Sequence, residues 1–154
     1  MKREIIFRGK RVDNGEWISG WLIKGFADSL YIMDECSYGE HLDYGGHAYG
    51  RFHKVIPETV GQFTGLLDKK NNKVFEGDII EFKVDPSFYI DAKSGDKYII
   101  EYYGAGFFMK PIIWGNRKID AQNYVGLLPP YQTSNMRNHY EITGNIHESL
   151  TPNK

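Results

Sequence analysis

The strongest constraint on the fold is a series of short runs in which side chains of different polarity alternate with a period of two. Ile80 and Phe82 alternate with Glu81 and Lys83 in the clearest of these runs. Successive side chains of a β-strand point to opposite faces, so this period is typical of strands with one buried face. Related runs lie at 5–7, 17–23, 98–103 and 140–146. We therefore expect a mainly β fold.

Turn-forming residues separate these runs. Asn14 and Gly15 suit the positive φ angles of a type I′ hairpin, and the Gly-Ala-Gly segment at 104–106 predicts a second hairpin. In the polar loop at 68–72, Asn71 and Asn72 are both available for a left-handed position. Many short strands between turns favour a small barrel or a sandwich, and a closed barrel leaves no strand edge exposed. We expect Ile5 and Phe7 to close the sheet by pairing with the strand at 140–146.

Other stretches lack a clear period and predict irregular structure. They lie at 34–53, 85–96 and 115–138, and residues 119–128 are the place where we expect one short helix. No repeat, low-complexity tract or linker divides the 154 residues, which is a usual length for one domain. The sequence therefore predicts a single domain over residues 1–154.

Composition narrows the class of protein further. The formal net charge is −1, so no overall attraction to nucleic acid is expected. The single cysteine, Cys36, rules out an internal disulfide framework and fits a reducing compartment. The start of the chain lacks the apolar region of a secretory signal, and no apolar run approaches the roughly 18 residues of a membrane span. We expect no membrane partner.

Histidines at a regular spacing form the sharpest candidate metal site. His41, His47 and His53 recur every six residues among acidic side chains and Cys36. Imidazole, thiolate and carboxylate together bind zinc or related ions. However, this spacing places the histidines on no common helical face, and structural zinc sites usually pair ligands two to four residues apart. A polar loop is the alternative interpretation, and we predict no metal and no cofactor.

Two further constellations have a chemical and a structural interpretation. Glu76 and Asp78 flank Gly77 and could share a cation or a proton. A tight turn explains the same three residues, with glycine for the φ angle and aspartate accepting from backbone N–H groups. Cys36 near a histidine could act as a nucleophile, or be an incidental thiol. No nucleophile elbow, Walker A loop or dinucleotide motif is present, so we predict no catalytic residue.

Basic and aromatic residues suggest a binding surface instead. Aromatic side chains beside cations could stack nucleic-acid bases, or the cations could simply be a solvated strand face that discourages edge pairing. Tryptophans at 17, 21 and 114 are typical core or interface anchors, and for Trp21 we favour the core. The basic residues concerned are Lys2, Arg3, Arg8, Lys10, Arg11, Arg51, Lys54, Lys69, Lys70 and Lys73.

Several motifs together resemble the YopX family of phage and prophage proteins. They are FRGK at 7–10, GEWISG at 15–20, VIPETVGQFTGLLD at 55–68, KVFEGDII at 73–80 and YEITGNIHE at 140–148. The motif residues to which we assign structural or turn roles are Pro57, Glu58, Gly61, Gln62, Gly65, Asp68, Glu76, Gly77, Asp78, Gly144 and Asn145.

This resemblance carries expectations of its own. It implies a core of SH3-like barrel character, a phage or prophage origin and a cytoplasmic location. It supplies no reaction, so no catalytic residue is carried over. Residues 34–53 depart from the motifs and are expected to be a variable insertion.

Three functions remain open from the sequence. The leading hypothesis is a non-enzymatic accessory module that binds a protein partner or assembles with itself as a homo-oligomer. Its motivation is the abundance of aromatic residues without a catalytic constellation. The alternatives are a weak nucleic-acid-binding protein that uses the basic N-terminal residues and a metal-dependent enzyme built on the three histidines.

Overall fold

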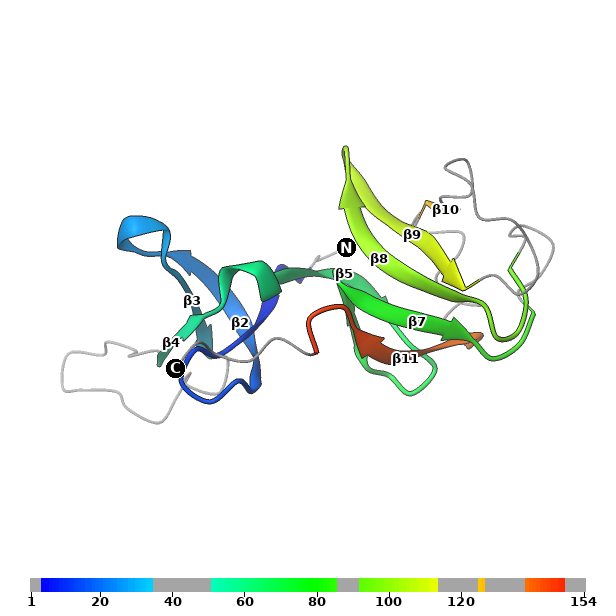
Figure 1. Cartoon of the computed structure of the whole chain (residues 1–154), viewed down its shortest axis with the longest axis horizontal. Coiled ribbons are helices and arrows are strands. Elements are labelled where there is room, and N and C mark those ends of the chain that lie inside the picture. The colour runs from blue at the N-terminus through cyan, green and yellow to red at the C-terminus, as the bar shows by residue number, and fades with distance from the viewer. Residues whose placement is uncertain (1–3, 35–50, 86–91, 114–124, 127–137, 149–154) are drawn as a thin grey trace. The chain divides into compact units, whose positions relative to one another are not determined.

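The structure is a computed structural model that describes residues 4–34, 51–85, 92–113, 125–126 and 138–148. The chain divides into two compact units (Figure 1), and each is described by itself. The N-terminal unit ends at Phe63, and the C-terminal unit runs from Thr64 to Glu148. The single domain over 1–154 stays a prediction, and most of its insertion at 34–53 lies outside the described residues.

Two antiparallel sheets contain nearly all of the regular structure, which confirms the mainly β prediction. Their strand orders are β4-β3-β2-β1-β5-β6 and β10-β9-β8-β7-β11. The strands are β1 (Phe7–Lys10), β2 (Trp17–Lys24), β3 (Leu30–Asp34), β4 (Phe52–Val55), β5 (Gly61–Leu67), β6 (Lys73–Phe75), β7 (Asp78–Phe82), β8 (Lys97–Tyr103), β9 (Gly106–Ile113), β10 (Val125–Gly126) and β11 (Tyr140–Asn145). Within the described ranges, the 3-10 turns η1 (Phe26–Asp28) and η3 (Pro57–Thr59) lie between strands.

The first hairpin, β1–β2, differs from the predicted type I′ turn. Among the described residues, Gly15 has a positive φ of 74° and Asn14 does not, whereas a type I′ turn needs two such residues in succession. The N–H of Gly15 donates to the carbonyl of Arg11 at 3.0 Å, which makes a wider turn. The Asn14 side chain accepts the N–H of Glu16 at 3.0 Å. This local bond explains why asparagine suits the turn without left-handed backbone.

The core of the N-terminal unit lies on one side of β1–β4. Ile6, Ile32 and Val55 are at most 2% exposed, and each such side chain contributes about 1.5–3 kcal/mol through burial. Gly9 on β1 suits this packing, because a Cβ there would lie 3.2 Å from the Val55 Cβ, closer than most such contacts. The strands can therefore approach closely at this point.

The 3-10 turn η3 separates β4 from β5. The chain passes from β4 through η3 into β5, and both flanking strands contact β1. The Val12 N–H donates to the Lys54 carbonyl at 2.9 Å, and the Ile56 N–H donates to the Lys10 carbonyl at 2.8 Å. Beyond η3, Gly61 lies opposite Arg8. No sheet closes fully into a barrel within the described residues.

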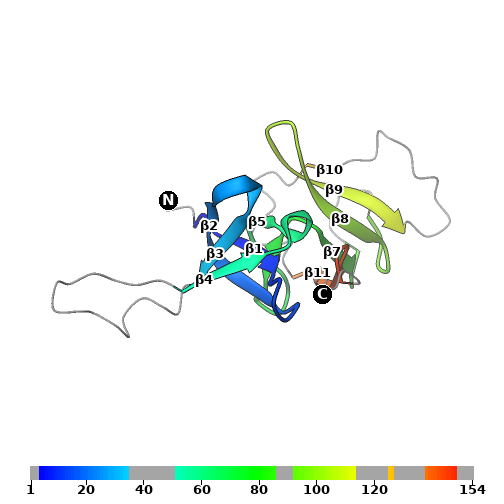
Figure 2. The same cartoon turned by 60° about the vertical axis from the view of Figure 1, so that its left-hand side comes forward.

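The C-terminal unit is built on the long β8–β9 hairpin, with β7 and β11 beside it (Figures 1 and 2). Its core residues alternate along the strands as predicted, since Ile80 and Phe82 are fully buried and Tyr98 and Ile100 are 1% exposed. The Phe82 ring meets the rings of Tyr98 and Tyr140 edge to face, with centroids 5.6 and 6.0 Å apart. Such pairs add about 0.5–1.5 kcal/mol beyond burial.

Three details of the predicted sheet are wrong. Phe7 on β1 pairs with β2 and β5, so no edge of β1 remains for β11, which pairs with β7. A bulge between Ile142 and Gly144 shifts the alternation in β11, leaving Asn145 buried and Ile146 exposed. A helix over 119–128 is wrong at Val125–Gly126, because these residues form strand β10 and pair with β9. Residues 119–124 and 127–128 lie outside the described residues.

No helix in the described ranges is long and apolar enough to span a membrane.

Candidate functional site

Three adjacent strands of the N-terminal unit present an outer face of apolar side chains. Directly opposite residues of antiparallel strands point to the same side of the sheet. The register places Trp21, Met33 and Phe52 in one row across β2, β3 and β4. Ile23, Tyr31 and Lys54 form the next row. We call these two rows the outer face.

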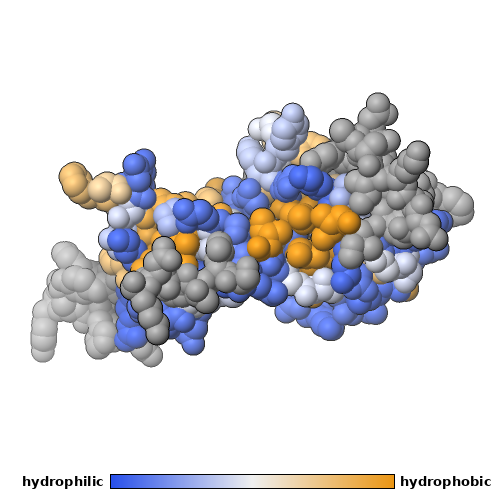
Figure 3. Space-filling model, viewed as in Figure 1, coloured by the Kyte–Doolittle hydropathy of each residue, from blue (hydrophilic) through white to orange (hydrophobic). Residues whose placement is uncertain are grey.

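The outer face is exposed to solvent, whereas the opposite face of the same sheet is buried. Phe52 is 57% exposed, Trp21 39% and Ile23 37%, whereas Ile32 on the opposite side is fully buried. Figure 3 shows apolar surface on the part of the molecule that holds β2–β4. A cluster of large apolar side chains in contact with solvent marks an interaction surface more often than a scattered single residue does.

The turn that joins β2 to β3 extends this apolar surface. Phe26 in η1 is 95% exposed, and an apolar projection lies at this turn in Figure 3. Ala27 and Asp28 have φ angles of 52° and 58°, a left-handed region that non-glycine residues rarely adopt. A Cβ at Gly25 would lie 2.6 Å from the Tyr31 ring, so the ring rests directly on this glycine. The turn therefore holds a strained backbone and presents an apolar tip.

The predicted basic residues of the N-terminal unit are largely engaged in internal contacts. The Arg8 guanidinium lies 4.6 Å from the centre of the Trp17 ring, and the Lys10 ammonium lies 5.5 Å from it. Arg11 forms an ion pair with Asp13.

The remaining basic candidates are divided among different places. Lys70 pairs with Glu141 at 3.1 Å in the C-terminal unit, and Lys69 and Lys73 lie in that unit as well. Lys2 and Arg3 lie outside the described residues. The cations of the N-terminal unit are matched by a similar number of acidic residues. The described part of the chain therefore presents no basic stripe of the kind that binds nucleic acid.

Of the three candidate histidines, His53 is the one that lies in the described residues. His53 lies on β4 opposite Ile32, on the side of the sheet away from the outer face. His41, His47 and Cys36 lie outside the described residues, as does Trp114. Within the ranges that are described, no group of three or more histidine, cysteine, aspartate or glutamate side chains is arranged to hold a metal ion.

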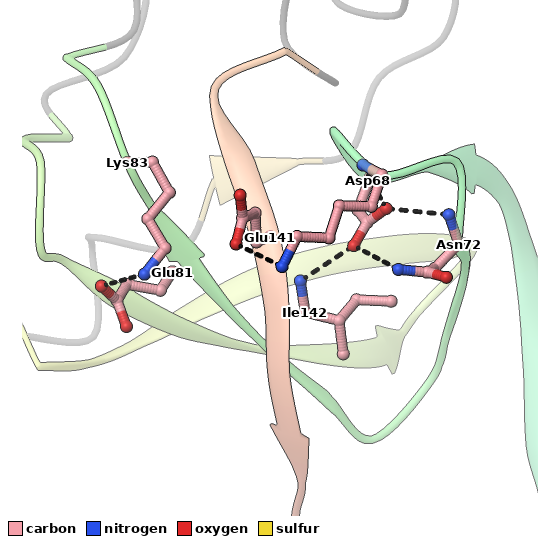
Figure 4. A network of polar contacts seen from close by, with 7 residues as sticks. Asp68, Asn72, Glu81, Lys83, Glu141 and Ile142 are labelled. Carbon is pink, nitrogen blue, oxygen red and sulfur yellow. Dashed lines mark hydrogen bonds and ion pairs between the residues drawn. The ribbon is translucent and has the colours of Figure 1, made fainter.

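The first of two polar joints is centred on Asp68, which is fully buried (Figure 4). Its carboxylate accepts the N–H groups of Lys70 and Asn72 at 2.8 Å and the Asn72 side-chain amide at 3.1 Å. It also accepts the N–H of Ile142 on β11 at 3.2 Å. Asn71 completes the turn with a φ of 65°. Asp68 thus occupies the outer edge of β11, where an additional strand would otherwise bind.

The ionisation of this joint follows from its contacts. Burial by itself would raise the pKa of Asp68, but the hydrogen bonds from Asn72, Ile142 and Lys70 outweigh it and hold the pKa below its usual value. Burial, with a smaller contribution from the Asp68 charge, raises the pKa of Tyr140. The Tyr140 hydroxyl donates to the Leu67 carbonyl at 3.1 Å. Asp68 is therefore an ionised structural acceptor beside a neutral tyrosine.

The second joint is centred on Asp78. Its carboxylate accepts the Phe75 N–H at 2.8 Å and the Asn145 side-chain amide at 3.2 Å. Gly77 has a φ of 84°, which the turn before β7 requires. The Ile146 N–H donates to the Gly77 carbonyl at 3.0 Å. The joint thus ties the β6–β7 turn to the end of β11.

The other motif residues lie in turns or in strands β5 and β11. Pro57 and Glu58 open η3, with proline at the first position of the turn. Gly61 and Gln62 pair with β1, and Gly65 has a φ of 88° within β5. Figure 4 also shows Glu81, which forms an ion pair with Lys83, and this pair lowers the pKa of Glu81. Glu76 lies in the turn before Gly77, and Gly144 follows the bulge of β11.

An aromatic tip of the β8–β9 hairpin is the second exposed apolar feature. Tyr102 and Tyr103 are 51% and 73% exposed. Their rings meet those of Phe107 and Phe108 edge to face, on opposite sides of the hairpin. Gly104, with a φ of 63°, closes the predicted turn.

Sequence reasoning missed the residues that complete the outer face. The alternating runs did not include β3 or β4, so Met33 and Phe52 had no predicted neighbours. The segment from Leu30 to Met33 is a short apolar run that could have indicated β3. The sequence gives no comparable signal for β4, whose exposed positions alternate an aromatic ring with a lysine.

Comparisons with known proteins place the chain in a family. The family model described as YopX protein matches residues 6–151. Among solved structures, the chain is similar to the crystal structure of protein EF1440 from Enterococcus faecalis, with 19% sequence identity, a TM-score of 0.49 and 96% of each chain covered. No protein with a curated description matches. Because the family model spans nearly the whole length, the chain belongs to the YopX family.

Proposed function

We propose that this chain is a non-enzymatic binding module that docks a protein through the outer face of β2–β4. The observation that carries the proposal is the exposure of Trp21, Ile23 and Phe52 in adjacent positions of one sheet. Aromatic residues gathered at the centre of a surface are typical anchors of protein interfaces.

The use of the buried acids supports a module without catalytic chemistry. Asp68 and Asp78 are the buried carboxylates among the motif residues, and both accept hydrogen bonds from backbone and side-chain N–H groups. Carboxylates held in this way fix turns and strand ends. A general acid or base needs instead an oxygen that faces a substrate.

We also infer an SH3-like barrel character for the N-terminal unit. Two features support it: η3 interrupts the strand that runs from β4 into β5, and the end of β4 bonds back to β1 through Lys54 and Ile56. The outer face would then be one wall of a small barrel. Family membership supports a phage or prophage origin and a cytoplasmic location. Fractionation of producing cells tests the location, and recovery in a secreted or membrane fraction would contradict it.

Affinity capture with matched variants tests the proposed function. The tagged chain is incubated with lysate of its bacterial host, with and without nuclease, beside Trp21→Ser/Phe52→Ser and a control, Tyr103→Ser. Tyr103 is 73% exposed but lies in the C-terminal unit. A protein recovered by the wild type and the control, but lost with the double variant, supports the proposal.

Each other result has a defined meaning. Equal recovery by the double variant and the wild type removes the outer face from the interaction. Recovery that disappears with nuclease, for all variants alike, favours nucleic-acid binding over protein docking, and this binding should weaken steeply with salt.

A further inference from the structure

We infer that the protein docked on the outer face is a second copy of this chain, so that two outer faces pack against each other around a two-fold axis. This inference rests on the proposed function and names its partner.

The apolar area of the face fits a standard interface between two copies. Applied to aromatic side chains of about 150–250 Å², the summed exposed fractions of Trp21 and Phe52 on the outer face and of Phe26 at the η1 turn correspond to roughly 290–480 Å². Apolar atoms supply about 56–65% of a typical interface. An apolar surface of this size thus implies an interface of roughly 450–850 Å² per partner, whose upper end reaches the about 800 Å² of stable complexes.

The shape of the face is self-complementary. Its two rows lie across three consecutive antiparallel strands, so the apolar side chains project from a sheet surface rather than from a groove. Two such sheet faces pack about 10 Å apart with interdigitating side chains. An axis along β3, the central strand, would place Trp21 of one copy against Phe52 of the other. It would also bring Met33 close to its own counterpart, as a two-fold interface requires.

The charges around the face favour protein over nucleic acid as the occupant. Lys54 is the cation within the two rows, and it is exposed. Lys24, at the end of β2, is neutralised by Asp28 at 2.9 Å. A surface with one uncompensated cation provides little attraction for a phosphate backbone. The same surface tolerates burial against a second apolar sheet, because a lysine at the rim keeps its ammonium in water.

Sedimentation of the full chain at rising concentration is the first test. We expect the wild type to pass from monomer to dimer in the micromolar range, and Phe52→Ser to weaken the dimer by at least about tenfold, as loss of a central aromatic anchor does. Tyr103→Ser should behave as the wild type. Circular dichroism of each variant shows that it is folded.

Symmetric cross-linking provides the second test. In a Cys36→Ser background, Met33→Cys should form a disulfide-linked dimer on mild oxidation, because the axis brings the two Met33 positions together. Tyr103→Cys in the same background is the control for random collision. Faster cross-linking at position 33 than at 103 supports the inference, and equal or slower cross-linking counts against it.

Failure of this inference differs from failure of the proposed function. A strictly monomeric wild type whose capture of a host protein still depends on the outer face overturns the second copy and keeps the docking function. A dimer that Phe52→Ser leaves unchanged overturns the inference as well. If the face variants still dimerise and still capture the host protein, both the inference and the proposed function are overturned.

Discussion

The outer face and the Asp68 joint are opposite departures from the usual distribution of side chains. On the outer face, large apolar groups such as Phe52 contact solvent. At the joint, a carboxylate that is normally exposed is fully buried. The buried carboxylate is explained inside the chain, because four N–H groups occupy its oxygens. The exposure of the outer face is instead accounted for by the proposed partner.

This difference separates the role of the motif residues from the role of the surface. Asp68, Asp78 and Asn145 belong to the segments that identify the family, and each holds a turn or strand end in place. The outer face, by contrast, includes positions outside the motifs, such as Met33 and Phe52. The motifs therefore specify how this chain folds, and partner choice is expected to depend on the face.

The largest expected effect in this comparison is loss of the Asp68 carboxylate. Asp68→Ala should lower the free energy of unfolding by about 3 kcal/mol, because it leaves several buried N–H groups without an acceptor. Urea denaturation measures the change. Asp13→Ala, which removes an exposed carboxylate, is the matched control and should have no resolvable effect. Equal midpoints for the two variants would contradict a structural role for Asp68.

Acid should reproduce part of this loss. The pKa of Asp68 is lower in the folded chain than its ordinary value of about 3.9, so the unfolded state binds the proton more readily. The stabilisation from Asp68 is therefore present above its ordinary pKa and is lost as pH falls toward the folded-state value. Urea midpoints across this range should fall less for Asp68→Asn than for the wild type. A parallel decline in both would show that other carboxylates dominate acid unfolding.

The Asp78 joint should follow with a somewhat smaller effect. Asp78→Ala removes the acceptor of the Phe75 N–H and of the Asn145 amide, at an expected cost of about 2 kcal/mol. A double-mutant cycle with Asn145→Ala should give a coupling of about 1 kcal/mol, since the two side chains are in direct contact. Strictly additive effects would mean that the joint is held by backbone bonds alone.

Strand positions could be predicted where the period of two is continuous, as at Ile80, Phe82, Tyr98 and Ile100. The pairing of distant strands could not. Ile5 and Phe7 have the alternation of a strand that could meet β11, but local hairpin formation gives β1 its neighbour first, and β5 takes the other edge. Register depends on such competition between edges, which a single sequence does not display.

The candidate site was predicted less well than the fold, for a physical reason. A buried strand repeats apolar residues at every second position, whereas β4 carries Phe52 and Lys54 on its exposed side. An exposed binding surface needs no regular pattern, because its partner lies outside the chain. The η1 turn could not be predicted from the sequence either, since Ala27 is not a residue that predicts a left-handed backbone.

The η1 turn provides a substitution that we expect to raise, rather than lower, the free energy of unfolding. Ala27→Gly should raise the free energy of unfolding by about 0.5–1 kcal/mol, because glycine adopts a positive φ without the Cβ clash that alanine suffers. Thermal unfolding measures the gain, and Ala92→Gly, at a buried position of ordinary φ, should instead destabilise. A loss of stability in Ala27→Gly would contradict backbone strain at this position.

The smallest effect on the monomer should come from the outer face itself. Phe52→Ser removes a ring that is already 57% exposed, so in dilute solution the free energy of unfolding should change by less than about 0.5 kcal/mol. At higher concentration the two proteins should diverge, because a dimer that forms only from folded chains raises the apparent stability of the wild type. Thermal midpoints should therefore rise with concentration for the wild type and stay constant for Phe52→Ser. A large loss in dilute Phe52→Ser would instead make this ring part of the fold, and the contrast between face and joint would disappear.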